Sequence, residues 1–379
     1  MERKETRSAD NRKVAITPPL RIHMHRIHHL FFVALFVALL GSAISALSAQ
    51  RPQQRGDDRA LREFYRGRTV RLVVGFPPGG GADAYSRLVA RHLGRFVPGN
   101  PTVAVANMPG AGSIIAGNHI FNAGPKDGSE IGMLNGAAIL EQLFGNPGVR
   151  FDMARFRYLA VPVNETYVMV VARQTGIAKF TELFGAGAKQ ALVGAIPNST
   201  LEHAPVLLRD VLHANIKIVS GYKGSADIRL AMDSGEIGGF FNPWSTIKPT
   251  AWDKFKSGEW LVLAQLTDQP LRDLPAASVP VISELTNDAI HRSLLRYGTS
   301  APNQFGKVYM LPPDVPAERA AALEAAFVET LNDKSFLADA EKSKLDITPI
   351  FGASILAIVK DFLDMPPAIK ERLSRTIKK

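Results

Sequence analysis

Two glycine-rich turns contain the residues of this sequence whose types and spacing could do chemistry. The first turn is Pro78–Asp83 and the second is Asn107–Ser113, and each lies between an apolar stretch and a helical pattern. Glycine lets the main chain approach a ligand closely, because it has no Cβ. A helix that begins at such a turn directs unpaired N–H groups and the positive end of its dipole at the ligand. Both turns therefore predict an anion site made of backbone.

Two polar turns in the second half of the chain are further candidates. Asn198 and Ser199 lie in the turn Gly194–Thr200, and Tyr222 lies in the turn Gly221–Ser225. Asn, Ser and Thr before a helix are first of all N-caps. Contact with a ligand is the alternative. Tyr222 and Ser225 would then close a ligand-binding cleft from the second half of the chain.

A nucleotide site is disfavoured by the residues after the first turn. Gly79-x-Gly81-x-x-Ala84 fits the dinucleotide fingerprint after a strand. The fingerprint also needs an Asp or Glu about 20 residues further on, at the end of the next strand. The next predicted strand, Thr102–Ala106, is followed by Asn107 instead. A Walker A sequence and a G-x-S-x-G elbow are both missing from the chain.

Metal and thiol chemistry are also disfavoured. The chain has no cysteine, which excludes disulfides and thiolate ligands. Its histidines form no HExxH pair, and the tract with His23, His25, His28 and His29 lies in the N-terminal extension. We expect no metal and no cofactor.

Strands and helices alternate along the chain, which predicts an α/β fold with parallel βαβ units. The first series has strands at Thr69–Gly75, Thr102–Ala106 and Ile131–Leu134. A second series starts at Tyr167–Ala172 and continues with strands at Ala191–Ala195, Lys217–Val219, Gly238–Phe241 and Trp260–Leu266. A late strand at Gln304–Leu311 is expected to return to the first module.

The N-terminus has the three parts of a secretory signal peptide. Arg21 and Arg26 precede the apolar run Leu30–Leu40, and small residues follow up to Ala49. The run is shorter than the roughly 20 residues of a membrane span, so we expect cleavage near Ala46 to Gln50 and export to the periplasm. Residues before Met24 are mostly polar, and translation from Met24 instead of Met1 is our hypothesis for this extension.

The charge of the chain is positive but dispersed. Residues 1–49 hold seven of the 45 Lys and Arg and three of the 35 Asp and Glu, so the remainder has 38 against 32, a net charge of +6. This excess suits an anionic ligand. No block of five or six like charges is present, so nucleic-acid binding is not expected.

The motifs resemble those of the Bug/TctC extracytoplasmic solute-binding receptors of tripartite tricarboxylate transporters. The resemblance covers about residues 65 to 375, and its motifs occur in the family's order. They are matched by Pro78, Gly79, Gly80, Asp83 and Arg87; by Asn107, Pro109, Gly110, Ala111 and Gly112; by Pro125, Asp127 and Gly128; by Tyr222, Gly224, Asp227 and Gly235–Ile237; and by Leu311–Pro316.

This resemblance implies a two-lobed periplasmic-binding-protein fold of type II. Each lobe would be a mainly parallel sheet flanked by helices, and two crossovers would join the lobes. A linker is expected at 50–65, the first part of lobe 1 at 66–162, lobe 2 at 163–295, and the return to lobe 1 with the C-terminal helices at 296–379.

The resemblance also implies the function. The protein would be a monomeric receptor, not an enzyme, that captures a small organic acid and delivers it to membrane permease subunits. The ligand-binding role falls on Pro78, Gly79, Gly80, Gly81, Asp83, Gly110, Ala111, Gly112, Ser113, Asn198, Ser199 and Tyr222. We expect Asp83 to cap its helix and hold the loop without touching the carboxylate. A periplasmic ligand sensor and an exported enzyme are the alternatives.

Four positions depart from the family pattern. Gly81 stands where a threonine is common, and Ser113 and Ala116 each replace a glycine. Asn198 occupies a turn where relatives often have a Gly-Ser pair. We therefore expect the solute to differ from citrate or simple dicarboxylates.

Overall fold

The structure is a computed structural model that describes residues 58–267, 270–275 and 279–378. Residues Ala60–Lys379 form one compact unit, which contains both β-sheets. A short helix occupies residues 58–65. The predicted signal peptide and N-terminal extension, 1–49, and residues 50–57 of the predicted linker lie outside the described residues.

The first sheet is mixed and six-stranded, in the order β11-β4-β10-β3-β1-β2. Its strands are β1 (Thr69–Val74), β2 (Thr102–Asn107), β3 (Glu130–Leu134), β4 (Arg157–Val161), β10 (Val308–Leu311) and β11 (Ile350–Phe351). Strand β1 is parallel to β2 and β3, with Leu72 opposite Val105 and Ile131. Strand β10 is antiparallel to β3 and β4, so the chain re-enters this sheet late, as predicted.

The second sheet is mixed and five-stranded, in the order β7-β6-β8-β5-β9. Its strands are β5 (Tyr167–Ala172), β6 (Ala191–Ala195), β7 (Ile216–Ser220), β8 (Gly239–Pro243) and β9 (Trp260–Leu266). Strand β6 is parallel to β7 and β8, whereas β5 is antiparallel to β8 and β9. We call each sheet with its helices a lobe. The two-lobed α/β fold with two crossovers is confirmed. The sheets are mixed because β5 and β10, the strands that enter a lobe from the other one, run against their neighbours, as does the short β11 against β4.

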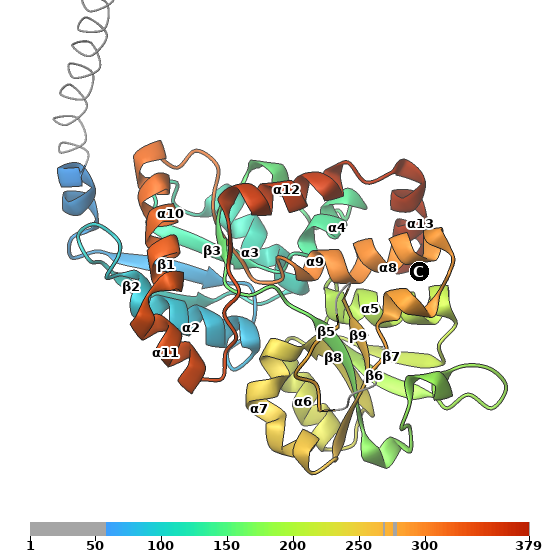
Figure 1. Ribbon diagram of the computed structural model, residues 1–379. Helices are drawn as coiled ribbons and strands as arrows, with labels where there is room; N and C mark the ends of the chain where they lie inside the picture. The colour runs from blue at the N-terminus through green and yellow to red at the C-terminus, as the bar shows by residue number, and fades with distance from the viewer. Residues whose placement is uncertain (1–57, 268–269, 276–278, 379) are drawn as a thin grey trace, which may run out of the picture. The chain divides into compact units, whose positions relative to one another are not determined.

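Helices connect most of these strands (Figure 1). The α-helices are α2 (Gly81–Leu93), α3 (Ile114–Asn118), α4 (Ala138–Leu143), α5 (Thr200–Leu212), α6 (Ser225–Asp233), α7 (Trp244–Lys256), α8 (Ala289–Leu295), α9 (Ala301–Asn303), α10 (Ala317–Asn332), α11 (Lys334–Lys342), α12 (Gly352–Leu363) and α13 (Pro367–Ile377). The 3₁₀ and π turns are η1 (Ala111–Ser113), η2 (His119–Ala123), η3 (Met153–Arg155), η4 (Arg173–Thr175), η5 (Phe180–Leu183), η6 (Ile282–Leu285) and η7 (Arg296–Ser300). Among the described helices, none is long and apolar enough to cross a membrane.

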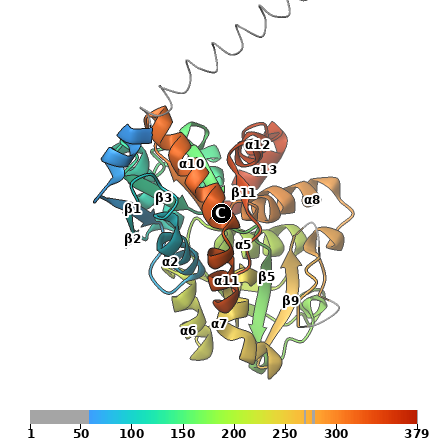
Figure 2. The ribbon, with the colours of Figure 1, turned by 60° about the vertical axis from the view of Figure 1, so that its left-hand side comes forward.

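The two sides of β1 belong to different hydrophobic cores, because successive strand residues point to opposite faces. Leu72 and Val74 pack in a core with residues of α2, α10 and α11, such as Phe327. Val73 belongs to the other core, which continues into the second sheet. Figures 1 and 2 show α2, α10 and α11 together on one face of the first sheet, with α12 near α4 on the other. The carboxyl end of β1 is therefore rigidly held from both sides.

Candidate functional site

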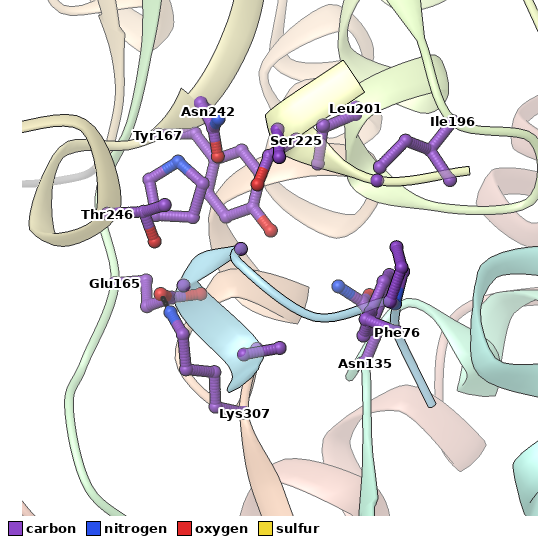
Figure 3. Close-up of a pocket in the computed structure, with 18 residues that line it drawn as sticks. Phe76, Asn135, Glu165, Tyr167, Ile196, Leu201, Ser225, Asn242, Thr246 and Lys307 are labelled. Atoms are coloured by element: carbon purple, nitrogen blue, oxygen red, sulfur yellow. Dashed lines mark ion pairs between the residues drawn. The ribbon is translucent and has the colours of Figure 1, made fainter. Parts of the chain in front are cut away.

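A cavity of about 490 Å³, counting the part open to solvent, is lined by both lobes. Figure 3 shows side chains of the second lobe, such as Asn242 and Thr246, across from the start of α2 in the first lobe. The lining residues are Phe76, Pro77, Gly80, Gly81, Ala82, Asn135, Glu165, Tyr167, Ile196, Leu201, Gly224, Ser225, Ala226, Asn242, Pro243, Thr246, Gly306 and Lys307. We call it the main cavity.

Three α-helices begin at the main cavity. Helix α2 begins after Gly80, α6 after Gly224 and α7 after Pro243, and no side chain caps any of these three ends. The first N–H groups of a helix have no partner inside it. Within the described residues, the amides of Gly80, Gly81, Ala82, Ser225 and Ala226 make no hydrogen bond to the protein. The three helix dipoles therefore favour an anion in this cavity.

The glycines of the first turn let the two lobes approach closely. A Cβ on Gly80 would lie 3.0 Å from the Oγ of Ser225, and a Cβ on Gly81 would lie 2.9 Å from the Cβ of Thr246. Both partners belong to the second lobe, in α6 and α7. A side chain at either glycine would enter the space between α2 and the opposite wall.

No side chain caps α2, so Asp83 is not the helix cap expected from the sequence, but it holds the first turn through its hydrogen bonds. Its carboxylate accepts hydrogen bonds from the Gly79 N–H at 3.0 Å, Arg87 Nε at 2.9 Å and Asn107 Nδ2 at 3.0 Å. Burial acts to raise the pKa of Asp83, but these hydrogen bonds outweigh it and lower the pKa below its usual value. The amide of Gly79 is thus occupied by Asp83, while those of Gly80 and Gly81 are not.

The second glycine turn lines a neighbouring cavity. Gly110, Ala111 and Gly112 lie there with Tyr222, and this cavity shares Phe76 and Ile196 with the main one. The φ angles of the turn are positive from Gly110 (142°) through Ala111 (47°) and Gly112 (62°). A Cβ on Gly112 would lie 2.7 Å from the carbonyl carbon of Asn198, so this turn also packs directly on the second lobe.

Four of the predicted site residues make hydrogen bonds within the protein. The Ser113 Oγ is buried and accepts a hydrogen bond from the Asn135 N–H at 3.0 Å. Ser199 is the N-cap of α5, where its Oγ accepts from the Leu201 N–H at 3.3 Å. The Asn198 N–H donates to Glu202 Oε2 at 2.9 Å, and the Tyr222 hydroxyl donates to Glu236 Oε1 at 2.6 Å.

The structure therefore divides the predicted residues into three groups. Gly80 and Gly81 line the main cavity. Gly110, Ala111, Gly112 and Tyr222 line the neighbouring cavity. Neither lining includes Pro78, Gly79, Asp83, Ser113, Asn198 or Ser199.

Several residues of the main cavity are not among those predicted from the sequence. Asn242, at the end of β8, is 2 % exposed, and its Nδ2 has no hydrogen-bond partner among the described residues. A buried amide without a partner is costly, and here it lies in the cavity wall, where a ligand oxygen can accept from it. Its position at the carboxyl end of a strand is the signal that could have identified it.

Glu165 and Lys307 form a buried ion pair in the lining of the main cavity (Figure 3). Glu165 lies in the crossover between β4 and β5, and Lys307 lies directly before β10. The Lys307 ammonium also lies 4.8 Å from the ring centre of Tyr85. Sequence spacing could not have joined two residues so far apart in the chain.

Metal ligation has no support in the described part of the chain. No group of three or more His, Cys, Asp or Glu there could hold a metal ion. The arrangement can bind an anion with backbone amides and an uncharged acceptor with Asn242.

Comparison with solved structures shows the fold. The chain is similar to the periplasmic binding protein BugD, with a TM-score of 0.64 and 18% identity over 82% of this chain and 98% of that one. It is also similar to MatC from Rhodopseudomonas palustris with bound malate, with a TM-score of 0.59 and 16% identity over 82% of this chain and 99% of that one. A further R. palustris protein, with adipate, has a TM-score of 0.60 and 18% identity over 82% of this chain and 97% of that one.

Sequence comparison adds one curated relative. It is the "UPF0065 protein in tcbD-tcbE intergenic region" of Pseudomonas sp. (strain P51), 27% identical over 205 residues, which are 52% of this chain. The match spans 57% of that relative's length. No protein-family model matches the chain. The predicted resemblance to the Bug/TctC binding proteins is confirmed, and what these comparisons establish is the fold.

Proposed function

From the fold that this chain shares with the Bug-type periplasmic binding proteins, we propose that it is a periplasmic receptor for a small carboxylate-bearing solute. The solute binds in the main cavity between the lobes, and the loaded receptor delivers it to a membrane permease of the tripartite tricarboxylate type. Malate and adipate in two structures of this fold support a carboxylate as the ligand. We propose that the receptor acts as a monomer after its signal peptide is removed.

One observation carries this proposal: three uncapped helix N-termini from two lobes meet at one cavity. Helix α2 belongs to the first lobe, and α6 and α7 belong to the second. A carboxylate between them would accept hydrogen bonds from both lobes at once. Such a ligand stabilises the closed arrangement more than an open one and shifts the population toward it.

The chemistry of the lining favours a receptor over an enzyme. Its charged residues, Glu165 and Lys307, pair with each other, and its other polar side chains are Asn135, Tyr167, Ser225, Asn242 and Thr246. A nucleophile needs an adjacent base, and the described lining holds no histidine beside Ser225 or Thr246. A ligand sensor would use the same cavity and would differ in its membrane partner.

The test compares carboxylic acids with their amides. The purified protein is heated with mono- and dicarboxylates, aromatic acids and amino acids, each beside the amide of the same shape. An acid present at about 100 times its dissociation constant should stabilise the fold by about 2.7 kcal/mol, and its amide should not. Equal stabilisation by acid and amide, or none by any acid, would contradict an anion site.

Two further assays separate the alternatives. A bound acid recovered unchanged after long incubation supports a receptor, and its conversion would show an enzyme. Loss of uptake of that acid on deletion of the receptor gene supports delivery to a permease, whereas unchanged uptake with an altered transcriptional response would favour a sensor.

A further inference from the structure

We infer that the Glu165–Lys307 pair makes the main cavity selective for a solute with one carboxylate and an uncharged polar far end. A dicarboxylate of the same length would bind more weakly. This inference rests on the proposed function and specifies the solute class of the same site.

The pair has a fixed position at the side of the cavity where the chain crosses between the lobes. Glu165 and Lys307 are 5 % and 3 % exposed. The Ser245 hydroxyl donates to Glu165 Oε1 at 3.2 Å, and the Glu165 N–H donates to the Asn303 carbonyl at 3.3 Å. A Cβ on Gly306 would lie 3.4 Å from the Glu165 Cδ, so the carboxylate packs closely over a residue without a side chain.

The charges of the cavity wall sum to zero. Glu165 and Lys307 are the charged residues of its lining, and they neutralise each other. Burial acts to lower the pKa of Lys307, whereas a carboxylate beside it, from Glu165 or from a ligand, favours its charged form. The positive potential that remains comes from the N-termini of α2, α6 and α7.

One carboxylate at the helix N-termini uses this potential, but a second carboxylate near the pair finds no unpaired cationic side chain in the described lining. Removing an ionised carboxylate from water is costly unless a cation pairs with it. Near the pair, repulsion by Glu165 offsets the attraction of Lys307.

An uncharged polar group avoids both costs. A hydroxyl or amide oxygen can accept from one of the three N–H groups of Lys307 or from the unpartnered Nδ2 of Asn242. A cavity that binds a diacid would need an unpaired positive group for each of the two carboxylates. This cavity offers one to a single carboxylate, because Glu165 already pairs with Lys307.

The test measures affinity for matched acids by titration calorimetry. Succinate, glutarate and adipate are compared with 4-hydroxybutyrate, 5-hydroxypentanoate and 6-hydroxyhexanoate, so each pair differs only in the far group. At the chain length that binds best, the hydroxy acid should bind at least about ten-fold more tightly than the diacid. Equal or tighter binding of the diacid would overturn the selectivity and leave the carboxylate receptor intact. If no acid binds in this series or in the wider acid panel, the proposed function itself fails.

A charge-removing variant tests whether the pair is the cause. Glu165→Gln leaves Lys307 unpaired, and the diacid should then gain at least about ten-fold relative to the hydroxy acid. Glu141→Gln is the matched control, because Glu141 is also buried and paired, with His203 at 3.0 Å, but does not line the cavity. The control should keep the wild-type preference. A Glu165→Gln protein that folds and still prefers the hydroxy acid as strongly as the wild type would contradict the inference. If this variant does not fold, the comparison of matched acids on the wild-type protein decides.

Discussion

The side chain of Thr246 fills the space that the missing side chain of Gly81 leaves. A Cβ on Gly81 would lie 2.7 Å from the Cγ2 and 2.9 Å from the Cβ of Thr246. Gly81 begins α2 in the first lobe, and Thr246 lies in the first turn of α7 in the second. The Bug/TctC motif commonly has a threonine at the position of Gly81. In this protein Thr246 supplies a threonine hydroxyl to the cavity from the opposite wall.

Exchange of these two residues should be tolerated better than the single change. Gly81→Thr alone adds a side chain where Thr246 already lies, and such overpacking costs about 1–3 kcal/mol. We expect it to hinder closure and lower carboxylate affinity at least about ten-fold. The double variant Gly81→Thr/Thr246→Gly should regain most of the loss, measured by calorimetry with the acid that binds best. A double variant no better than the single one would refute this coupling.

A large side chain at Gly80 should abolish binding and leave the fold intact. Gly80 has an extended backbone, with φ −89° and ψ 174°, that any residue can adopt. Its added side chain would project toward Ser225 and into the cavity. Gly80→Leu should therefore bind no acid while it keeps a normal circular dichroism spectrum. Pro78→Leu is the control, because Pro78 lies two residues away and does not line the cavity. Normal binding by Gly80→Leu would contradict the site.

Asp83→Asn should destabilise the protein by about 2 kcal/mol or more, because a buried charged acceptor loses its hydrogen bonds. Since the pKa of Asp83 is lowered in the folded state, its contribution is present above the unfolded value of 3.8. The contribution is lost as the pH falls through the lower, folded pKa. Urea unfolding at a series of pH values measures both effects.

Asp227→Asn controls for the helix dipole. Asp227 is exposed and occupies the same position in the first turn of α6 that Asp83 occupies in α2. This change should alter the free energy of unfolding by no more than about 0.5 kcal/mol. Equal effects of the two substitutions would show that Asp83 does not hold the turn through its hydrogen bonds.

Two serines at helix starts should separate binding from stability. Ser225 lines the main cavity, so Ser225→Ala should reduce acid affinity about five-fold or more and leave stability unchanged. Ser199 caps α5 and is buried, so Ser199→Ala should cost about 1 kcal/mol of stability and leave affinity unchanged. Calorimetry and urea unfolding of both variants check this, and a reversed pattern would mean that the roles are assigned wrongly.

Much of the fold follows from local patterns in the sequence. Strands β5, β6 and β9 have the predicted bounds, because each is an uninterrupted pattern between clear turn residues. Strand β10 is shorter than predicted, since residues 304–307 form a turn before Val308. Strand β4 and helix α7 were not predicted. Helix α7 contains Pro249 and a non-helical Ala251, which conceal its helical pattern.

Only the part of the candidate site that consists of backbone groups could be predicted from the sequence. Glycine turns are visible in a sequence, and they led to Gly80 and Gly81. Thr246 could not be found, because it depends on the unpredicted α7. Glu165 and Lys307 lie in segments that only the tertiary fold brings together.

A crystal structure of the protein with the acid that binds best is the decisive test of a backbone anion site between the lobes. We predict carboxylate oxygens within hydrogen-bond distance of backbone N–H groups at the start of α2 and at the start of α6. A carboxylate bound only by side chains, or one seated outside the main cavity, would show that this site is assigned wrongly.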